Sequence, residues 1–380
     1  MNRKLRMAMV GGGKESFVSR YHISAARMTG IIDLVCGAFG STRHRSFEGG
    51  EELRLPRDRV YGAYRDMLRK EATLAEDVRP DFVVITAPNN LHYPVAMASL
   101  DAGFHVLCEK PLTTNMDEVL NLRRKLEDKK FFIGLTFSYS GYAMVRQAAA
   151  LIKEGRIGNI RRVTVEYPQG WLAARLETAG NRQAGWRADP RRAGPSGCMA
   201  DVGSHAAYLT ELLTGLTITE VSADVRACVA GRPLEDDGAV LFHLSNGAHG
   251  VLWASQIAIG ETGNLRFRVY GDKGGMLWEL DNPNALVLHN PSGSSEILRM
   301  GVPLTPQTAT PPTGRSECAI AALSYIYKQF AEEILAFDGK PNPTPSFPSF
   351  DEGLRAVAFV DAVLRNTHAE NKDKWTPITA

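Results

Sequence analysis

The chain has 380 residues, which is too long for one small core and suits two domains of about 150 residues each. Its 44 basic residues almost balance its 42 acidic residues, and no basic stripe interleaved with aromatic side chains occurs, so we expect no nucleic-acid partner. No apolar run approaches the roughly 20 residues of a membrane helix, and the apolar stretch near the N-terminus is too short for a signal peptide.

The five cysteines are scattered and form no CxxC pair, so neither a disulfide framework nor a zinc site is indicated. His243 and His249 have no Cys, His or carboxylate at ligand spacing, and we expect no metal. A cytoplasmic protein that acts on a small molecule fits these properties best.

Residues 1–137 alternate short β-rich runs with helical stretches. Alternation of this kind predicts a doubly wound parallel sheet with right-handed crossovers. Each run is apolar on both faces, as expected for a sheet covered by helices. The runs are LRMAMV, IDLVCGAF, DFVVITA, HVLCE and FFIGLTF.

The first run ends in VGGGKES, in which Gly11 and Gly13 occupy the first two glycine positions of GxGxxG, Gly12 lies between them and Ser16 replaces the third glycine. Glycines there allow the backbone to approach a pyrophosphate at a helix N-terminus. A triple glycine after a strand is also an ordinary loop, so the motif depends on its context. The next helical run is expected to begin at His22, after a long loop.

The second run carries the signal for cofactor choice. An acid at its tip would bind the ribose of NAD, whereas an arginine accommodates the phosphate of NADP. The tip reads GSTRHR, with Ser41, Arg43 and Arg45, and Asp33 lies at the opposite end. The sequence therefore favours NADP over NAD by a small margin, because a solvated arginine in a surface loop would look the same.

Two further motifs end runs at the carboxyl edge of the sheet, where ligands of open α/β folds bind. The first, TAPNNLH, supplies candidate cofactor ligands: Thr86, Pro88, Asn89 and His92. The second is EKP, in which Pro111 prevents the strand from continuing and directs Lys110 into the crevice. Considered alone, Glu109 and Lys110 are better explained as a solvated pair that closes a strand, but the second half of the chain favours both as cofactor-binding residues.

Residues 138–380 follow a different pattern. A helix over 142–154 precedes six runs joined by Gly-containing turns, which predicts a second α/β domain with an open, largely antiparallel or mixed sheet. The Pro- and Thr-rich stretches 303–314 and 341–350 are expected to be surface loops. The runs are RRVTVEY, VSADVRACV, GAVLFHLS, AHGVLWASQIAI, NLRFRVYG and MLWEL.

One helix in this domain, over 194–215, carries an acid and a histidine. Asp201 and His205 are four residues apart and share a face, and Gly215 is expected to end the helix. An aspartate at this spacing can orient a histidine and tune its pKa. The buried stripe of the helix is predicted to consist of Val202, Ala206, Leu209 and Leu213.

The glycine loop, TAPNNLH, EKP and DVGSH, in this order, resemble the glucose-fructose oxidoreductase / inositol dehydrogenase (Gfo/Idh/MocA) family. The resemblance implies a Rossmann domain, a second domain whose open sheet mediates homo-oligomerisation (dimer or tetramer), and a C-terminal helical segment that packs back. It also implies that Lys110, Asp201 and His205 are catalytic. Ser16 and the long loop before His22 depart from the family pattern.

The implied reaction is hydride transfer between nicotinamide and a secondary alcohol or ketone of a sugar, glycoside or cyclitol. His205 would accept the hydroxyl proton and Lys110 would stabilise the alkoxide on the same oxygen, although the lysine could itself relay the proton. Redox-assisted glycoside cleavage and a non-catalytic nucleotide-binding sensor remain alternatives.

Further side chains of the second domain could bind a polyol. Arg187 and Arg191 could equally bind an acidic substrate or form surface ion pairs, and Trp253 could equally be sheet packing. The substrate-binding candidates, besides Asp201 and His205, are Tyr139, Gln169, Trp186 and Arg187, with Tyr167, Trp171 and Gln256 as additional polar or stacking groups.

Overall fold

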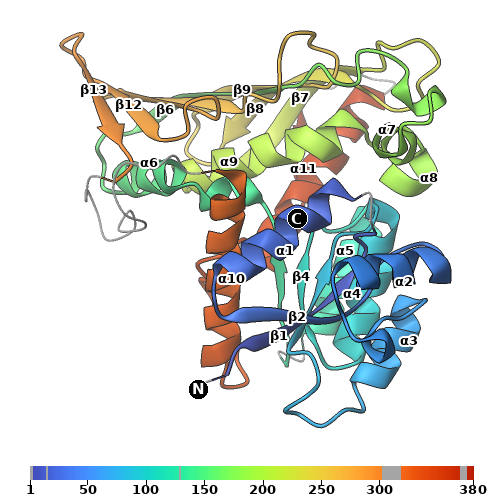
Figure 1. The fold of residues 1–380 in the computed structure, drawn as a ribbon. Coiled ribbons are helices and arrows are strands. Elements are labelled where there is room, and N and C mark those ends of the chain that lie inside the picture. Colours follow the sequence, from blue (N-terminus) through green and yellow to red (C-terminus); the bar gives the residue numbers. More distant parts are fainter. Residues whose placement is uncertain (1–2, 14–15, 128–129, 302–317, 369–374) are drawn as a thin grey trace. The chain divides into compact units, whose positions relative to one another are not determined.

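The computed structural model describes residues 3–13, 16–127, 130–301, 318–368 and 375–380 (Figure 1). The chain forms two compact units, Met1–Ser138 with Ala319–Leu354 and Tyr139–Cys318 with Arg355–Ala380. The segment Ala319–Leu354 thus belongs to the first unit, whereas the sequence-based division assigned it to the second domain. Within the described residues, no helix has the length and apolar composition needed to span a bilayer.

The first unit contains the predicted doubly wound sheet. Its five strands are all parallel, in the order β2-β1-β3-β4-β5, and the order reverses between β1 and β3. The crevice at such a reversal, outside the carboxyl ends of the strands, is where doubly wound folds bind ligands. The strands are β1 (Leu5–Val10), β2 (Ile32–Ala38), β3 (Phe82–Ile85), β4 (His105–Cys108) and β5 (Ile133–Leu135).

Helices connect these strands, and one helix comes from a distant part of the sequence. Helix α10 packs against α1, and its Tyr327 and Phe330 join the same apolar core as Phe82. The helices are α1 (Phe17–Met28), α2 (Arg43–Glu52), α3 (Tyr64–Glu71), α4 (His92–Asp101), α5 (Met116–Leu126) and α10 (Ala319–Ala336).

The stretch 341–350 was expected to be a surface loop, and this is wrong for its end. Phe347 is 5% exposed, and the backbone N–H of Leu135 donates to the carbonyl of Pro348 at 2.7 Å. An apolar side chain in the loop therefore completes the core beside β5. The other stretch, 303–314, lies outside the described residues.

The second unit contains a nine-stranded mixed sheet in the order β13-β12-β11-β10-β6-β9-β8-β7-β14. All neighbours are antiparallel except β6 and β9, which are parallel. Strands β12, β13 and β14 were not predicted from the sequence. The strands are β6 (Ile160–Pro168), β7 (Ile218–Arg226), β8 (Asp237–Leu244), β9 (His249–Ser255), β10 (Arg266–Gly271), β11 (Gly275–Glu279), β12 (Ala285–His289), β13 (Ser295–Arg299) and β14 (Thr376–Pro377).

Helices α6 and α9 cover one face of this sheet (Figure 1). Large apolar side chains elsewhere on its strands are exposed, namely Leu241, Tyr270 and Ile297. The helices of this unit are α6 (Ala143–Lys153), α7 (Arg182–Arg187), α8 (Pro190–Ala193) and α9 (Ser204–Thr214), and α11 (Phe350–His368) begins in the first unit and continues in the second.

The helix predicted over 194–215 is not a single α-helix. Met199–Gly203 forms a π-helical turn that leads into α9, a local widening of the helix that often occurs at functional sites. Gly215 ends α9 in the left-handed conformation, as predicted. The predicted buried stripe is confirmed, with Val202, Ala206, Leu209 and Leu213 all at most 2% exposed.

Candidate active site

The glycine loop follows β1 directly. Gly11 has a φ of 99°, and a Cβ atom there would lie 2.7 Å from the backbone nitrogen of Ala87, so only glycine fits between the ends of β1 and β3. Gly12 also has a positive φ, and Gly13 lies against the carbonyl of Phe39 after β2. The three glycines thus bring the backbone to the reversal of strand order.

Helix α1 begins at Phe17, so the expectation that it begins at His22 is wrong. Ser16 is its N-cap, and its hydroxyl accepts from the backbone N–H of Ser19 at 3.4 Å. The residue that replaces the third glycine therefore caps the helix. The loop is shorter than predicted because the polar side chains near the start of α1 concealed its first turn.

The TAPNNLH segment extends this edge of the sheet. The backbone N–H of Thr86 donates to the carbonyl of Val10 at 2.9 Å, which joins the ends of β3 and β1. Pro88 caps a short 3-10 helix (Asn89–Leu91), and Asn89 is 7% exposed.

His92, predicted to bind the cofactor, is instead 1% exposed. Its Nδ1 and Nε2 lie 2.6 Å and 2.9 Å from the carbonyl oxygens of Pro111 and Ala87. Burial lowers the pKa of His92, so a neutral ring donates through one of these nitrogens. Both nitrogens face protein carbonyls, and the ring joins the TAPNNLH loop to the EKP loop.

The tip of β2 is basic. Ser41 is exposed, and the guanidinium groups of Arg43 and Arg57 lie 5.4 Å and 5.7 Å from the centre of the Phe47 ring. Asp33, at the other end of β2, pairs with Lys4 at 3.0 Å.

The EKP segment differs from a solvated pair. The Oε1 of Glu109 lies 2.9 Å from His22 Nε2 and accepts from Thr136 Oγ1 at 2.6 Å, while its Oε2 accepts from the backbone N–H of Lys110 at 3.1 Å. Lys110 follows directly at the tip of β4, and its bond to Pro111 is cis. His22 and Thr136 were not identified as site residues, because no local pattern links them to Glu109.

The ionisation of Glu109 reflects these partners. Desolvation raises its pKa, but the hydrogen bond and charge of His22, together with Lys110 and Thr136, outweigh it, and the pKa falls to about 2. A permanently charged carboxylate therefore lies next to Lys110 at neutral pH.

In the second unit, Asp201 Oδ2 accepts from Arg187 Nε at 2.9 Å and from Gln256 Nε2 at 2.8 Å. The Arg187–Asp201 ion pair is only 19% exposed on each side. Arg187 was expected either to bind an acidic substrate or to form an ion pair, and the structure contains the ion pair.

Aromatic rings surround the histidine of the DVGSH segment. His205 is 6% exposed, and its ring centre lies 4.8 Å from that of Tyr139 and 6.0 Å from that of Tyr167. The two tyrosine hydroxyls hydrogen-bond to each other. Desolvation raises the pKa of Tyr167 to about 12, so its hydroxyl remains a neutral donor or acceptor.

Indole rings hold the Arg187 side chain. Its guanidinium lies 4.2 Å from the ring centre of Trp186 and 5.6 Å from that of Trp171. Trp171 in turn donates to the Gln169 side chain at 2.9 Å. Tyr139, Gln169, Trp186, Arg187, Asp201 and His205 therefore form linked groups within this unit. In contrast, Arg191 is 89% exposed and pairs with Asp189, and Trp253 donates to Asp237 within the sheet.

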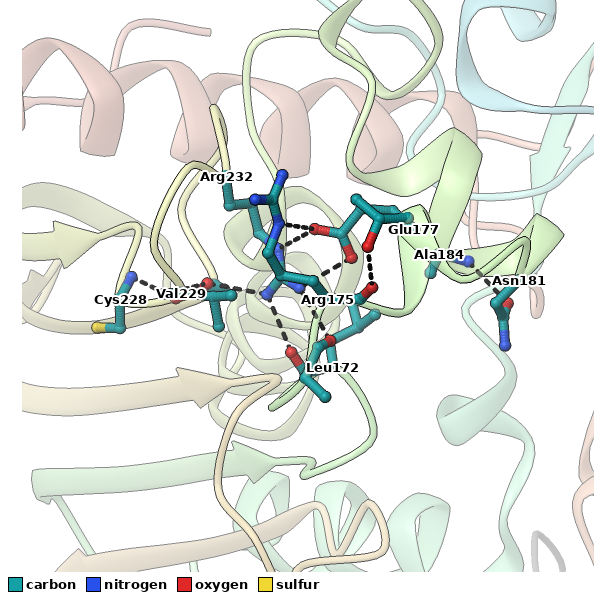
Figure 2. A network of polar contacts seen from close by, with 11 residues as sticks. Leu172, Arg175, Glu177, Asn181, Ala184, Cys228, Val229 and Arg232 are labelled. Carbon is teal, nitrogen blue, oxygen red and sulfur yellow. Dashed lines mark hydrogen bonds and ion pairs between the residues drawn. The ribbon is translucent and has the colours of Figure 1, made fainter.

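A buried arginine organises the loops that carry these residues (Figure 2). Arg232 pairs with Glu177 at 3.1 Å and with Asp236 at 2.9 Å, and it donates to the carbonyls of Leu172 and Ala174. Asp236 also accepts from the backbone N–H groups of Cys228 and Val229.

The acid next to Asp236 caps the π-helical turn. Glu235 Oε1 accepts from Ser196 Oγ at 2.5 Å and from the backbone N–H groups of Gly197 and Met199. Burial raises the pKa of Glu235. Glu235 thus holds the turn that leads to Asp201, and Asp236 holds the arginine that anchors residues 172–177; neither role was predicted from the sequence.

The described residues contain no group of three or more His, Cys, Asp or Glu side chains arranged as metal ligands. The backbone N–H groups at the start of α1 suit the pyrophosphate of a dinucleotide. The glycine loop before α1 has no room for Cβ atoms and lies where the strand order reverses.

Comparison with protein families supports this interpretation of the fold. Residues 5–137 match a family described as oxidoreductase with an NAD-binding Rossmann fold, and residues 145–277 match the GFO/IDH/MocA C-terminal domain. The uncharacterized oxidoreductase YfiI of Bacillus subtilis (strain 168) is 32% identical over 381 residues, covering 97% of this chain and 96% of YfiI.

Solved structures are similar over nearly the whole chain. The inositol dehydrogenase homolog of Azotobacter vinelandii, complexed with NAD⁺, has a TM-score of 0.93 and 30% identity over 99% of this chain and 98% of its own. Its complex with NADH and myo-inositol has a TM-score of 0.91 and 29% identity, with the same coverage.

Proposed function

Because the chain belongs to the GFO/IDH/MocA family of NAD-binding oxidoreductases, we propose that it is a dehydrogenase that acts on a secondary alcohol of a sugar, glycoside or cyclitol. The observation that carries this proposal is the placement of Lys110 at the carboxyl edge of the parallel sheet, next to a carboxylate held in its charged form. Its similarity to a structure that holds NADH and myo-inositol supports the substrate class.

The nicotinamide would supply a hydride acceptor or donor. Lys110 hydrogen-bonds the reacting oxygen and stabilises its negative charge, and His205 takes or returns the hydroxyl proton. Tyr139 and Tyr167 hold the His205 ring in place. Asp201 holds Arg187 in place, and the Asp201 carboxylate also accepts from a substrate hydroxyl.

The substrate is a neutral polyol rather than an acid. The charge of Arg187 is already balanced by Asp201 at 2.9 Å, so an anionic substrate would have to compete with a partly buried ion pair. Trp171 and Trp186 offer apolar ring faces suited to a sugar.

For the cofactor, we propose a preference for NADP(H). Arg43 opens α2 at the tip of β2, held over Phe47, and the only acid in β2 itself, Asp33, lies at the far end. The free enzyme should bind NADPH more tightly than NADH, and Arg43→Ala should remove the difference. Titration monitored by nicotinamide fluorescence measures the affinities of NADPH and NADH for each protein. Tighter binding of NADH by the unaltered protein would contradict the preference.

A homo-oligomer assembled through the exposed face of the mixed sheet completes the proposal. Leu241, Tyr270 and Ile297 are 46%, 41% and 54% exposed on three strands of that sheet, and a partner on this face would remove them from water. All five cysteines are free thiols, which suits a reducing cytoplasm. Light scattering of the purified protein measures its mass, and the mass of a single chain would contradict the oligomer.

The central test is Lys110→Met, assayed with sugars, inositols and glycosides and with both cofactors. Turnover should fall by about 10²- to 10⁴-fold, because the group that stabilises the developing charge is removed, while cofactor affinity changes little. Lys153→Met, at an exposed position on α6, controls for the loss of one charge. Undiminished turnover in Lys110→Met would overturn the assignment. Cleavage of a glycoside without net change of cofactor would favour redox-assisted glycoside cleavage.

A further inference from the structure

A line of buried polar side chains runs from α10 through α1 to the tip of β4. Tyr327 Oη lies 2.7 Å from His22 Nδ1, and His22 Nε2 lies 2.9 Å from Glu109 Oε1. Tyr327 is 0% exposed and His22 is 1% exposed. These contacts join residues 305 and 87 positions apart in the sequence, so neither pair forms through local structure.

The direction of these hydrogen bonds follows from the partners. An ionised carboxylate only accepts, so His22 donates to Glu109 through Nε2–H. Burial, and then the charge of Glu109, raise the pKa of Tyr327 well above its usual range, which keeps its hydroxyl protonated. Tyr327 Oη lies 2.7 Å from Nδ1 and so fixes the ring plane in which Nε2–H points at Glu109.

Glu109 connects these side chains to the backbone of Lys110. The backbone N–H of Glu109 donates to the carbonyl of Ile85 on β3 at 2.9 Å. The Glu109 carboxylate accepts from the backbone N–H of Lys110 at 3.1 Å. Thr136 at the end of β5 donates to the same carboxylate at 2.6 Å. The peptide from which the lysine projects is therefore attached to three elements of the first unit.

We propose that Tyr327 and His22 are positioning residues that orient Glu109 and thereby fix Lys110 for reaction. The inference rests on the proposed role of Lys110 and adds two residues outside every motif of the sequence, one of them on a helix more than 200 positions away. Neither residue contacts substrate in this proposal. Their effect appears in turnover, because a catalytic group displaced by about 1 Å can lose about 100-fold in rate.

Three variants test the proposal. His22→Ala removes the donor to Glu109 and should lower kcat by about 100-fold, while KM and the cofactor Kd stay within about threefold. His22→Gln keeps an N–H of similar reach and should recover at least about tenfold of that loss. Tyr327→Phe removes a single hydroxyl from a buried ring and should lower kcat by about tenfold with little change in the melting temperature.

The matched control is Tyr64→Phe, which removes a hydroxyl from a half-buried tyrosine on α3 of the same unit and should leave kcat unchanged. Lys110→Met separates the two proposals. If Lys110→Met retains turnover, the proposed function fails. If Lys110→Met is inactive while His22→Ala and Tyr327→Phe keep the unaltered kcat, the positioning proposal fails alone. Equal loss in His22→Ala and His22→Gln would also overturn it, since the restored donor would then have no effect.

Discussion

Two charged groups, the part-buried Glu109 of the first unit and the buried Arg232 of the second, are satisfied in different ways. Glu109 in the first unit accepts from an imidazole, a hydroxyl and a backbone N–H. Arg232 in the second unit is paired with two carboxylates, those of Glu177 and Asp236, and donates to two backbone carbonyls.

The difference follows from the backbone around each group. Glu109 ends a strand of a parallel sheet, whose ladder already fixes the chain, so its partners only need to set an orientation. Arg232 lies between loops that no ladder holds, and its ion pairs define the path of residues 172–177 against 228–236 (Figure 2). Loss of the first network should therefore disturb chemistry in addition to stability, whereas loss of the second should act mainly on folding.

The largest effect on stability is expected from Arg232→Met. It leaves Asp236, which is only 1% exposed, without its arginine, and it leaves Glu177 to the more distant Arg175 at 3.9 Å. The free energy of unfolding should fall by about 3–5 kcal/mol. Urea unfolding measures it, with Arg191→Met as the matched control, because Arg191 also pairs with an aspartate but is 89% exposed and should contribute nothing measurable. Equal losses in the two variants would remove the distinction between the regions.

A smaller effect should appear as acid sensitivity of the first network. The pKa of Glu109 falls from 4.5 to about 2 on folding, so its contribution to stability is fully present above pH 4.5 and is lost as the pH falls toward 2. The contribution amounts to about 3 kcal/mol. Urea unfolding between pH 6 and about 3 should show this slope in the unaltered protein and a shallower one in Glu109→Gln. The same slope in both proteins would assign the acid sensitivity to other carboxylates.

The smallest effect is expected from Trp171→Ala in the second unit. Its indole is 36% exposed and lies 5.6 Å from the Arg187 guanidinium, a cation–π contact of about 0.5 kcal/mol at such a site. KM for the substrate should rise by no more than about threefold, with kcat unchanged. Steady-state kinetics check this. A large fall in kcat would mean that the exposed rim of the loop takes part in the chemistry.

Much of the first unit could be predicted because its signals are local. Strand runs apolar on both faces, a glycine loop after the first run and a proline after Lys110 each constrain the backbone within a few residues. The short strands β12 and β13 were missed although ALVLH and SEILR flank a turn that contains Pro and Gly. The start of α1 was missed because the polar side chains near its first turn concealed its helical period.

The networks could not be predicted from patterns. Nothing near His22 or Tyr327 indicates that the two side chains meet, and the apolar face of α10 would pack equally well on any buried surface of its size. Similarly, Arg187 could have faced solvent or a substrate, and the contact with Asp201 decides between them.

The sequence by itself determined the alternation of strands and helices, the positions of the glycine loop and Lys110, and the buried stripe beside His205, because these depend on side-chain period and on the backbone restrictions of glycine and proline. Only the tertiary structure decided which partners hold Glu109, Asp201 and Arg232. Hydrophobic burial is non-directional, whereas a buried charge requires donors or acceptors at about 3 Å, and those come from segments that become neighbours only in the folded chain.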